Sequence, residues 1–256
     1  MTPDSFSDGG HFQGVDLALR RAEEMVAEGA DIIDVGGEST RPGAAFVSLS
    51  EEIDRVIPVI EAIRARIEIP LSVDTSKSVV AAAALESGAD WINDVSGLSF
   101  DPALASVVSA RAGGLFLMHT RGTPAQMQQQ THYDNIVAEV ISELEASVSF
   151  ALAAGIPAER LAIDPGIGFA KDLAGNLVLL RRLAEFKVLG LPILLGTSRK
   201  SFIGKVIDQP LPVDRLFGTL ATIALGVASG AMILRVHDVR AARETAMMSW
   251  AILQQH

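Results

Sequence analysis

Residues 31–41, DIIDVGGESTR, pass from an apolar run (31–35) into a cluster of glycine, polar and charged residues. Six other apolar runs end in the same way, and each of the seven is followed by a stretch long enough for an amphipathic helix. The six are Leu71–Val73, Trp91-Ile92, Leu115–Met118, Leu161–Ile163, Ile193–Leu195 and Met232–Leu234. Apolar runs without alternation are typical of parallel strands buried on both faces, and strand–helix alternation predicts a parallel sheet. Because active sites of such folds lie at the carboxyl ends of the strands, the polar clusters there indicate an enzyme.

The length of the chain, 256 residues, is close to that of one (β/α)₈ barrel, which has about 250 residues. Proline and glycine occur as punctuation between periodic segments, so we expect a single domain spanning residues 1–256. The chain is 49% hydrophobic and has a mean hydropathy of +0.33, which predicts a large buried core. No uncharged run approaches the roughly 18–20 residues of a membrane span, and no signal peptide is visible.

Cysteine is absent, which excludes disulfides and thiolate nucleophiles and favours a cytoplasmic enzyme. The net charge of −10 argues against nucleic-acid binding, which needs a basic surface. Five basic residues near strand ends nevertheless stand out from this acidic background. They are Arg41, Arg121, Arg199, Lys200 and Arg235. The pattern indicates a small anionic ligand.

Eight segments show helical periodicity, although only seven strands are predicted. The eight are Val15–Glu28, Leu49–Ala65, Ser78–Leu85, Pro102–Ala112, Asn135–Ala153, Asn176–Phe186, Val213–Ala228 and Val239–Gln254. Glycines at 29, 88 and 155 supply stop signals. The opening segment Thr2–Gly10 reads as a strand-to-helix loop without its strand. We therefore expect an α/β fold, a (β/α)₈ TIM barrel whose first strand would lie just before Met1. That strand would be missing either because the sequence is truncated or because its start was assigned to an internal methionine.

Eight motifs in this chain, in order from residue 2 to about 240, resemble those of bacterial dihydropteroate synthases, a pterin-binding TIM-barrel family. They are TPDSFSDGG (2–10), GGESTRPG (36–43), SVDTSK (72–77), INDV (92–95), Met118-His119, DPGIGF (164–169), SRKS (198–201) and RVHD (235–238). One such motif alone is weak evidence. Eight at strand ends and in loops make coincidence very unlikely.

The resemblance implies a transferase of folate biosynthesis. It would condense 7,8-dihydropterin-6-ylmethyl diphosphate with p-aminobenzoate and release diphosphate, by a dissociative substitution. The resemblance also implies Mg²⁺ and a homodimer. In the family an Asn that contacts the Mg²⁺-diphosphate region comes immediately before the position of Met1, so the metal ligand is not in this chain.

The pterin presents an NH₂ group and a ring N–H, which need an anionic acceptor. Asp164, directly after a buried strand, is the natural carboxylate for that edge; the plainer interpretation is a turn capped by Gly166. Asn93 both donates and accepts, which suits a heterocycle, although an Asn-Asp pair is more often a turn. Asp74 follows another strand, and its carboxylate could stabilise positive charge on the pterin. The alternative for Asp74 is a helix N-cap.

Lys200 and Gly196 follow a single strand. Lys200 can donate to the pterin carbonyl or ring nitrogen, and two cations at a helix start invite a functional explanation. Gly196 lets the backbone approach a flat ring closely. By resemblance Met118 and Phe169 complete the pterin pocket, although Met118 is equally a packing residue.

Arg235 and His237, two residues apart on a predicted strand, should project to the same side. With Arg199 they form the predicted diphosphate site, since arginine makes bidentate phosphate contacts. A local ion pair with Asp238 is the structural alternative. Together with Asp74, Asp164 and Lys200, Arg235 and His237 make up the predicted catalytic set. The roles of His119 and Arg121 are less defined.

By resemblance, the first two loops bind p-aminobenzoate. The predicted residues are Phe6, Thr40, Arg41, Pro42, Phe169 and Ser201. Loop closure would exclude water, which competes with the aniline for the cation. The aniline nitrogen is neutral at pH 7, so the reaction needs no strong base.

Two other functions are compatible with these residues. One is a truncated, non-catalytic pterin-binding homologue, which would bind pterin and release no diphosphate. The other is a methyltetrahydrofolate:corrinoid methyltransferase-like barrel, which has no reason to keep Arg199, Lys200, Arg235 and His237 around a diphosphate.

The last helices are rich in apolar residues, which fits either a homodimer or a well-packed helix layer.

Overall fold

The computed structural model describes residues 11–41, 43–111 and 113–255. Two compact units are distinguished. The first comprises Met1–Leu117 and Ser147–Leu161, and the second comprises Met118–Ala146 and Ala162–His256. The prediction of a single domain is not tested by this division and stays a prediction.

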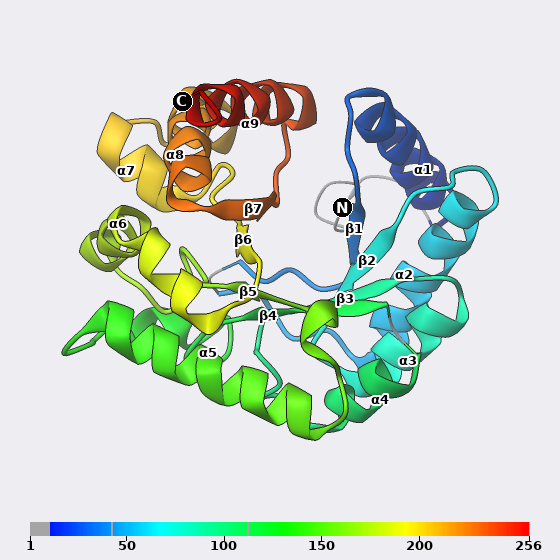
Figure 1. Cartoon of the computed structure of the whole chain (residues 1–256). Helices are drawn as coiled ribbons and strands as arrows, with labels where there is room; N and C mark the ends of the chain where they lie inside the picture. Colours follow the sequence, from blue (N-terminus) through cyan, green and yellow to red (C-terminus); the bar gives the residue numbers. More distant parts are fainter. Residues whose placement is uncertain (1–10, 42, 112, 256) are drawn as a thin grey trace. The chain divides into compact units, whose positions relative to one another are not determined.

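The first unit contains four parallel strands that pair in chain order. They are β1 (Ile33–Gly36), β2 (Leu71–Asp74), β3 (Trp91–Asp94) and β4 (Gly114–Met118). The helices that precede or follow them are α1 (His11–Ala27), α2 (Leu49–Arg64), α3 (Ser78–Glu86) and α4 (Ala103–Arg111). Within this unit the helices lie along one side of the strands (Figure 1).

The second unit carries nearly all of β5 (Leu161–Asp164), followed by β6 (Ile193–Leu195) and β7 (Ala231–Leu234), which are also parallel. Its helices are α6 (Leu173–Arg181), α7 (Ser201–Ile207), α8 (Leu216–Ser229) and α9 (Val239–Leu253). Helix α5 (Ile136–Ala153) begins in this unit and ends in the first. The described residues also contain four 3₁₀ segments that connect elements: η2 (Met127–Gln129), η3 (Ala158–Arg160), η4 (Leu183–Leu189) and η5 (Pro212–Arg215).

The strands lack alternation because most of their side chains are buried. Val35, Val73, Ile92 and Leu115 lie in matching positions of the first unit's ladder and are at most 2% exposed. Neighbouring polar strand residues such as Ser72 and Asn93 are buried as well. Burial of both faces is the property from which the sequence predicted parallel strands.

The structure confirms all seven predicted strands and places an α-helix in each of the eight predicted helical segments. The helix predicted over 176–186 begins earlier, at Leu173, and continues after Arg181 as η4. Helix α7 was not predicted, so the described residues contain nine α-helices. Gly29, Gly88 and Gly155 have positive φ, as the predicted stop signals require.

One local prediction is wrong. Arg235 and His237 do not lie on a strand, because β7 ends at Leu234. Ser198 Oγ accepts from the backbone N–H of His237 at 3.1 Å, so this segment bonds to the loop after β6 through a side chain.

Among the described residues no single helix is long and apolar enough to cross a membrane. Only α7 together with 212–229, across a 77° bend, reaches that length and composition.

Candidate active site

Asp164 ends β5 in the second unit and is 5% exposed. Its Oδ1 accepts from the backbone N–H of Gly166 at 2.7 Å, the turn that the plainer interpretation of the sequence foresaw. Burial raises the pKa of Asp164, while the positive charges of Lys200, Lys171 and Arg235 act in the opposite direction. A buried carboxylate with several cations directed at it can accept hydrogen bonds from a cationic or donor-rich ligand.

Gly196, directly after β6, is the point where three predicted residues converge. A Cβ placed on Gly196 would stand 3.7 Å from Asp164 Oδ2, 3.9 Å from Lys200 Nζ and 3.9 Å from Arg235 Cβ. These groups come from the carboxyl ends of β5, β6 and β7. A side chain at 196 would narrow the space between them, so glycine leaves room for a flat group at this position.

Lys200 is the N-cap residue of α7, and its Nζ donates to the carbonyl oxygen of Ile167. The same ammonium lies 4.7 Å from the centre of the Phe169 ring, a cation–π contact. The structure thus brings together Asp164, Phe169, Gly196 and Lys200, four of the seven residues predicted to bind pterin. A fifth, Met118, is the buried last residue of β4.

Arg199 forms a two-bonded ion pair with Asp238, with Nε at 2.9 Å from Oδ2 and NH2 bonded to Oδ1. Asp238 thus pairs with a residue 39 positions away, which is not the local ion pair weighed as the alternative for Arg235 and His237. The backbone of Arg199 has φ of +57°, a conformation that non-glycine residues rarely adopt. Such strain is maintained when the surroundings determine it, and it occurs most often at functional sites.

His237 is oriented by Ser198. Ser198 Oγ lies 2.9 Å from His237 Nδ1 and also accepts from the backbone N–H of His237. Loss of hydration lowers the pKa of His237, and the positive charges of Arg199 and Arg235 lower it further. The hydroxyl oxygen has two lone pairs, so Oγ can donate to Nδ1 or accept from it, and the contact fits either neutral tautomer. In the tautomer in which Oγ donates to Nδ1, the ring proton is on Nε2.

Sequence reasoning missed one network in the second unit. Lys171 Nζ contacts His119 Nδ1 at 2.9 Å, and His119 Nε2 lies 2.9 Å from Glu143 Oε2. Arg121 pairs with both Glu143 and Glu139. Lys171 could have been noticed because it directly extends the 164–169 motif. Glu143 lies mid-helix, with no signal in the sequence.

In the first unit, Asp74 and Asn93 end up as register partners on β2 and β3, and both are buried. Asn93 has only 5% exposure, which excludes a solvated turn for its side chain. The neighbouring Asp94 makes that turn, accepting from Ser96 and Leu98. Asp34 on β1 accepts from Ser72 on β2.

The loop that carries Thr40 and Arg41 is closed at its base by Lys77. Lys77 Nζ donates to Glu38 Oε2 at 2.7 Å, to Glu52 Oε2 at 2.5 Å and to the carbonyl oxygen of Val47 at 2.6 Å. Thr40 is half-buried and Arg41 is exposed. The other predicted p-aminobenzoate residues of this region, Phe6 and Pro42, lie outside the described residues.

Ser201, the last predicted member of that set, is the exposed first residue of α7. It lines a cavity of about 170 Å³ in the second unit, together with Gly168, Lys171, Asn176 and Lys205. The predicted p-aminobenzoate residues of the second unit, Phe169 and Ser201, therefore lie near the group around Lys200 in sequence and structure.

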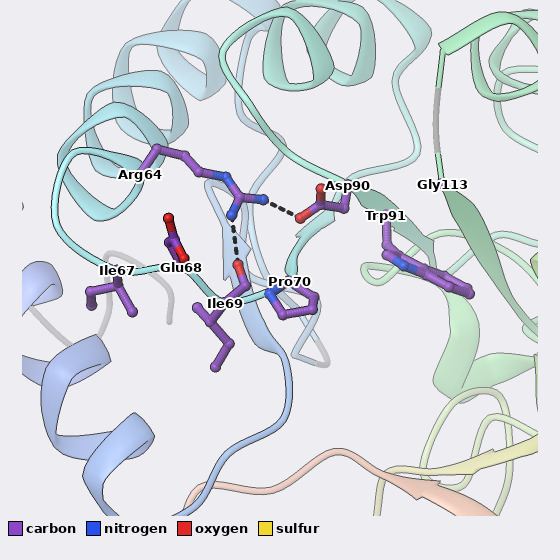
Figure 2. A pocket seen from close by; sticks show the side chains of 8 residues that line it. All are labelled: Arg64, Ile67, Glu68, Ile69, Pro70, Asp90, Trp91 and Gly113. Atoms are coloured by element: carbon purple, nitrogen blue, oxygen red, sulfur yellow. Dashed lines mark hydrogen bonds and ion pairs between the residues drawn. The ribbon is translucent and has the colours of Figure 1, made fainter.

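A larger cavity of about 680 Å³ lies in the first unit, at the opposite, amino-terminal ends of β2, β3 and β4 (Figure 2). Arg64 crosses it, donating at 2.7 Å to the carbonyl oxygens of Gly88 and Ile69 and pairing with Asp90. Residues at the amino ends of barrel strands usually serve stability, and Arg64 ties strand starts together here. We assign it a structural role.

The described part of the chain holds no group of three or more His, Asp or Glu side chains arranged for a metal ion. The side chains around Gly196 are one carboxylate and two cations, which do not form an oxygen-rich ligand set of the kind that Mg²⁺ prefers. The described residues therefore do not form a magnesium site by themselves.

Parallel strands alternating with helices, and charged residues at the carboxyl ends of those strands, define an α/β enzyme of the barrel class. The family of pterin binding enzymes matches residues 1–237. Dihydropteroate synthase from Synechocystis sp. is 50% identical over 240 residues, which cover 94% of this chain and 83% of that protein. The chain belongs to the pterin binding enzyme family.

Two solved structures agree with this assignment. Dihydropteroate synthase from Clostridium difficile, crystallised in the presence of pteroic acid, has a TM-score of 0.93 and 46% identity, covering 99% of this chain and 94% of that one. The enzyme from Xanthomonas albilineans with 4-aminobenzoic acid has a TM-score of 0.93 and 44% identity, covering 100% and 91%. The likeness confirms the predicted TIM-barrel fold class.

Proposed function

We propose that this protein is a transferase with dihydropteroate synthase activity. It condenses 7,8-dihydropterin-6-ylmethyl diphosphate with p-aminobenzoate to 7,8-dihydropteroate and diphosphate. The observation that carries the proposal is the convergence of Asp164, Lys200 and Arg235 around Gly196, in a chain that matches synthases over most of its length. A carboxylate for the pterin edge and cations for its carbonyl and diphosphate are the groups this reaction needs.

In the proposed complex the Asp164 carboxylate accepts from the pterin NH₂ and ring N–H, and Lys200 donates to the pterin carbonyl or ring nitrogen. Charge-assisted hydrogen bonds of this kind are about twice as strong as neutral ones. Asn93 and Met118 contact the same heterocycle, and the Phe169 ring and Gly196 accommodate its flat faces. Burial of Asp164 and Asn93 strengthens these contacts by excluding water.

The leaving group is the diphosphate. Arg235 and the Nε2–H of His237 donate to its oxygens, with Arg199 held nearby by Asp238. As the carbon–oxygen bond breaks, both electrons leave with the diphosphate and a pterin-stabilised methylene cation remains. The carboxylate of Asp74 stabilises that cation, because electrostatic stabilisation of developing charge is usually the largest catalytic contribution.

The amine of p-aminobenzoate then attacks the cation, a carbon–nitrogen bond forms, and the nitrogen loses one proton to water. We propose that Thr40, Arg41, Phe169 and Ser201, with Phe6 and Pro42, bind this second substrate. The Lys77 contacts at the base of the 38–47 loop hold Thr40 and Arg41 in place. No general base is needed, because the amine is neutral at pH 7.

Mg²⁺ remains a prediction. If it takes part, it would enter with the diphosphate, since magnesium often binds through substrate phosphates and water. Diphosphate release measured with magnesium and with excess chelator tests this prediction. Equal rates in both would reject it.

We further propose that the protein is a cytoplasmic homodimer. Large apolar side chains are exposed on α8 and α9. They include Phe217 (81% exposed), Leu225 (65%), Met247, Met248, Trp250 and Ile252 (58–62%). Apolar patches of this kind commonly mark interfaces. A molar mass of one chain, about 27 kDa, in light scattering would reject the dimer.

The experiment that tests the activity is diphosphate release by the purified 256-residue chain with both substrates, and with each one alone. We expect release only when both are present. Pterin binding without release would instead favour the non-catalytic homologue. Release without p-aminobenzoate would indicate hydrolysis of the pterin diphosphate and contradict the transferase.

A further inference from the structure

Lys171 is a buried titratable residue that the proposed reaction does not use. Lys171 lies in the segment between β5 and α6, and 2% of its surface is exposed. Its Nζ donates to the carbonyl oxygen of Phe169 at 2.8 Å and lies 2.9 Å from His119 Nδ1. A buried ammonium group is costly unless it neutralises a nearby negative charge. Its burial therefore indicates a negative charge that Lys171 stabilises.

His119 holds this ammonium in place. An ammonium group can only donate, so Nδ1 of His119 is the acceptor and its Nε2–H donates to Glu143 at 2.9 Å. Burial, together with the positive charge of Lys171, lowers the pKa of His119 to about 4, which keeps the ring in this neutral form. Glu143 is in turn bonded by Arg121. While Lys171 is charged, the direction of every hydrogen bond in the chain from Arg121 to Lys171 is therefore determined.

Among the negative charges that act on Lys171, that of Asp164 is the one that takes part in the proposed reaction. Lys171 Nζ lies 3.3 Å from the point where a Cβ on Gly166 would stand, and the N–H of Gly166 donates to Asp164. The backbone N–H of His119 also donates to the carbonyl oxygen of Asp164 at 2.9 Å. Each of the two charges favours the ionised form of the other.

Lys171 differs from the other two cations that act on Asp164. Lys200 and Arg235 converge at Gly196, where the substrate is proposed to bind. When a diphosphate takes up the charge of Arg235 and the pterin engages Lys200, their effect on Asp164 falls. The ammonium of Lys171 is instead engaged by His119 and the carbonyl oxygen of Phe169, so substrate bound at Gly196 leaves its charge available to Asp164.

We propose that Lys171 is a positioning residue of the pterin site. Its buried ammonium, held by His119, keeps Asp164 ionised while substrate occupies the other two cations. The inference rests on the proposed role of Asp164 as the acceptor for the pterin.

The pH range agrees with this role. The charged or titratable groups that act on Lys171 are Asp164, Lys200, Glu143 and Arg121, with His119 as its direct partner. Burial lowers the pKa of Lys171 to about 7, so the ammonium is charged below neutral pH. Protonation of Asp164, which would compete with pterin binding, also increases as pH falls, because burial raises its pKa.

The direct test measures the pKa of Asp164 by carboxyl ¹³C NMR in the wild type, K171M, K171Q and K171R. K171Q keeps a donor for His119 without the charge, and K171R keeps the charge. Removing a nearby opposite charge should raise the pKa of Asp164 by about one unit in K171M and K171Q and leave it near the wild-type value in K171R. An unchanged Asp164 pKa in folded K171M or K171Q overturns the proposal, whether or not the chain is an active synthase.

The kinetic test follows kcat/KM for the pterin diphosphate from pH 5 to 9. We expect the acid limb of K171M and K171Q to move up by about one pH unit, so that activity below the limb falls about tenfold and recovers above it. A merely structural role would lower activity equally at all pH values with the limb unmoved, which contradicts the proposal. A wild type that never releases diphosphate would refute the proposed function instead, while the NMR result would still decide the role of Lys171.

Discussion

Asp94 and Asp164 each form the last residue of a buried strand, β3 and β5, and burial raises the pKa of both. Their partners differ. Asp94 accepts from its own turn: from Ser96 N at 2.8 Å, Ser96 Oγ at 2.7 Å and Leu98 N at 2.6 Å. Asp164 takes only one bond from its turn, from Gly166, and is surrounded by the charges of three cations.

The difference shows how to separate a structural strand-end aspartate from a functional one. A carboxylate whose oxygens are used by its own turn stabilises that turn. A carboxylate that is stabilised by cations from other segments of the chain has oxygens left to accept hydrogen bonds from a ligand, although its burial destabilises the fold. The same contrast exists for two lysines and two serines, so three matched pairs of variants can test it.

The largest effect should come from the aspartates. D164N replaces the acceptor by an amide whose NH₂ faces the pterin donors, and losing two charge-assisted bonds should lower kcat/KM by about 10³, or about 4 kcal/mol. Its free energy of unfolding should stay within about 1 kcal/mol of the wild type, because removal of a costly buried carboxylate offsets the loss of a negative charge near Lys171. Steady-state kinetics and urea unfolding give the two values.

The matched control is D94N. An amide cannot accept at both ends, so the N–H of Leu98 loses its acceptor and stability should fall by about 2 kcal/mol. Its kcat/KM per folded molecule should stay within threefold of the wild type. If D94N lost activity as D164N does while remaining folded, the distinction between the two aspartates would be wrong.

The second pair is Lys200 and Lys77. K200M removes a proposed donor to the pterin and should lower kcat/KM by about 10², since one bond to a charged group contributes about 1.5–3 kcal/mol. The contacts of Lys200 include a hydrogen bond to the carbonyl oxygen of Ile167 and a contact with the Phe169 ring. We expect K200M to change the free energy of unfolding by no more than about 1 kcal/mol.

K77M should behave in the opposite way. Lys77 neutralises Glu38 and Glu52, and Glu52 is 1% exposed with its Oε1 buried and unsatisfied among the described residues. Leaving that carboxylate without its cation should cost about 3 kcal/mol of stability. E52Q in the same background should recover much of the loss. Full stability of K77M alone would show that Lys77 is not the structural lysine.

These pairs also show what could and could not be predicted from the sequence. The strands were predictable because burial of both faces leaves apolar runs, as at Leu115–Met118. Helix α7 was missed because it has only seven residues. Asp164 and Lys200 could be placed at strand ends, since each directly follows or closely follows an apolar run.

Contacts between distant residues were not predictable. Lys171 and His119 are 52 residues apart, and His119 and Glu143 are 24 apart. No local pattern encodes such a pairing, because it depends on how the segments that contain His119, Glu143 and Lys171 pack within the second unit. Likewise the Asn93-Asp94 pair suggested a turn, yet only the fold assigns that turn to Asp94 and leaves Asn93 on the strand for another role.

The third prediction concerns pH and Asp94. Its pKa is raised in the folded state, so between its ordinary value and the raised value the native protein holds a proton that the unfolded chain has lost. The stability contributed by Asp94 is therefore present at low pH and declines as pH rises through the folded pKa. The stability difference between wild type and D94N should grow as pH is lowered from 7 toward 4. A difference that shrinks over that range would contradict this sign.

The smallest effects should come from Ser96 and Ser198. Ser96 Oγ donates to Asp94 at 2.7 Å, so S96A should lose about 1 kcal/mol of stability and keep its kinetics. We propose that Ser198 Oγ donates to His237 Nδ1, which leaves the ring proton on Nε2, where it can reach a diphosphate. In S198A the ring can turn or take the other tautomer, so kcat should fall about fivefold, which is about 1 kcal/mol in the barrier.

The two serine variants distinguish orientation from stability more sharply than the larger pairs, because neither removes a charge. S198A also removes an acceptor for the backbone N–H of His237, so a small loss of stability is expected there too. The decisive variant is S198T, which keeps a hydroxyl at the same place and should restore kcat. If S198T stayed as slow as S198A while folding normally, the hydroxyl would not be orienting His237. The proposal that His237 binds the diphosphate would then be wrong.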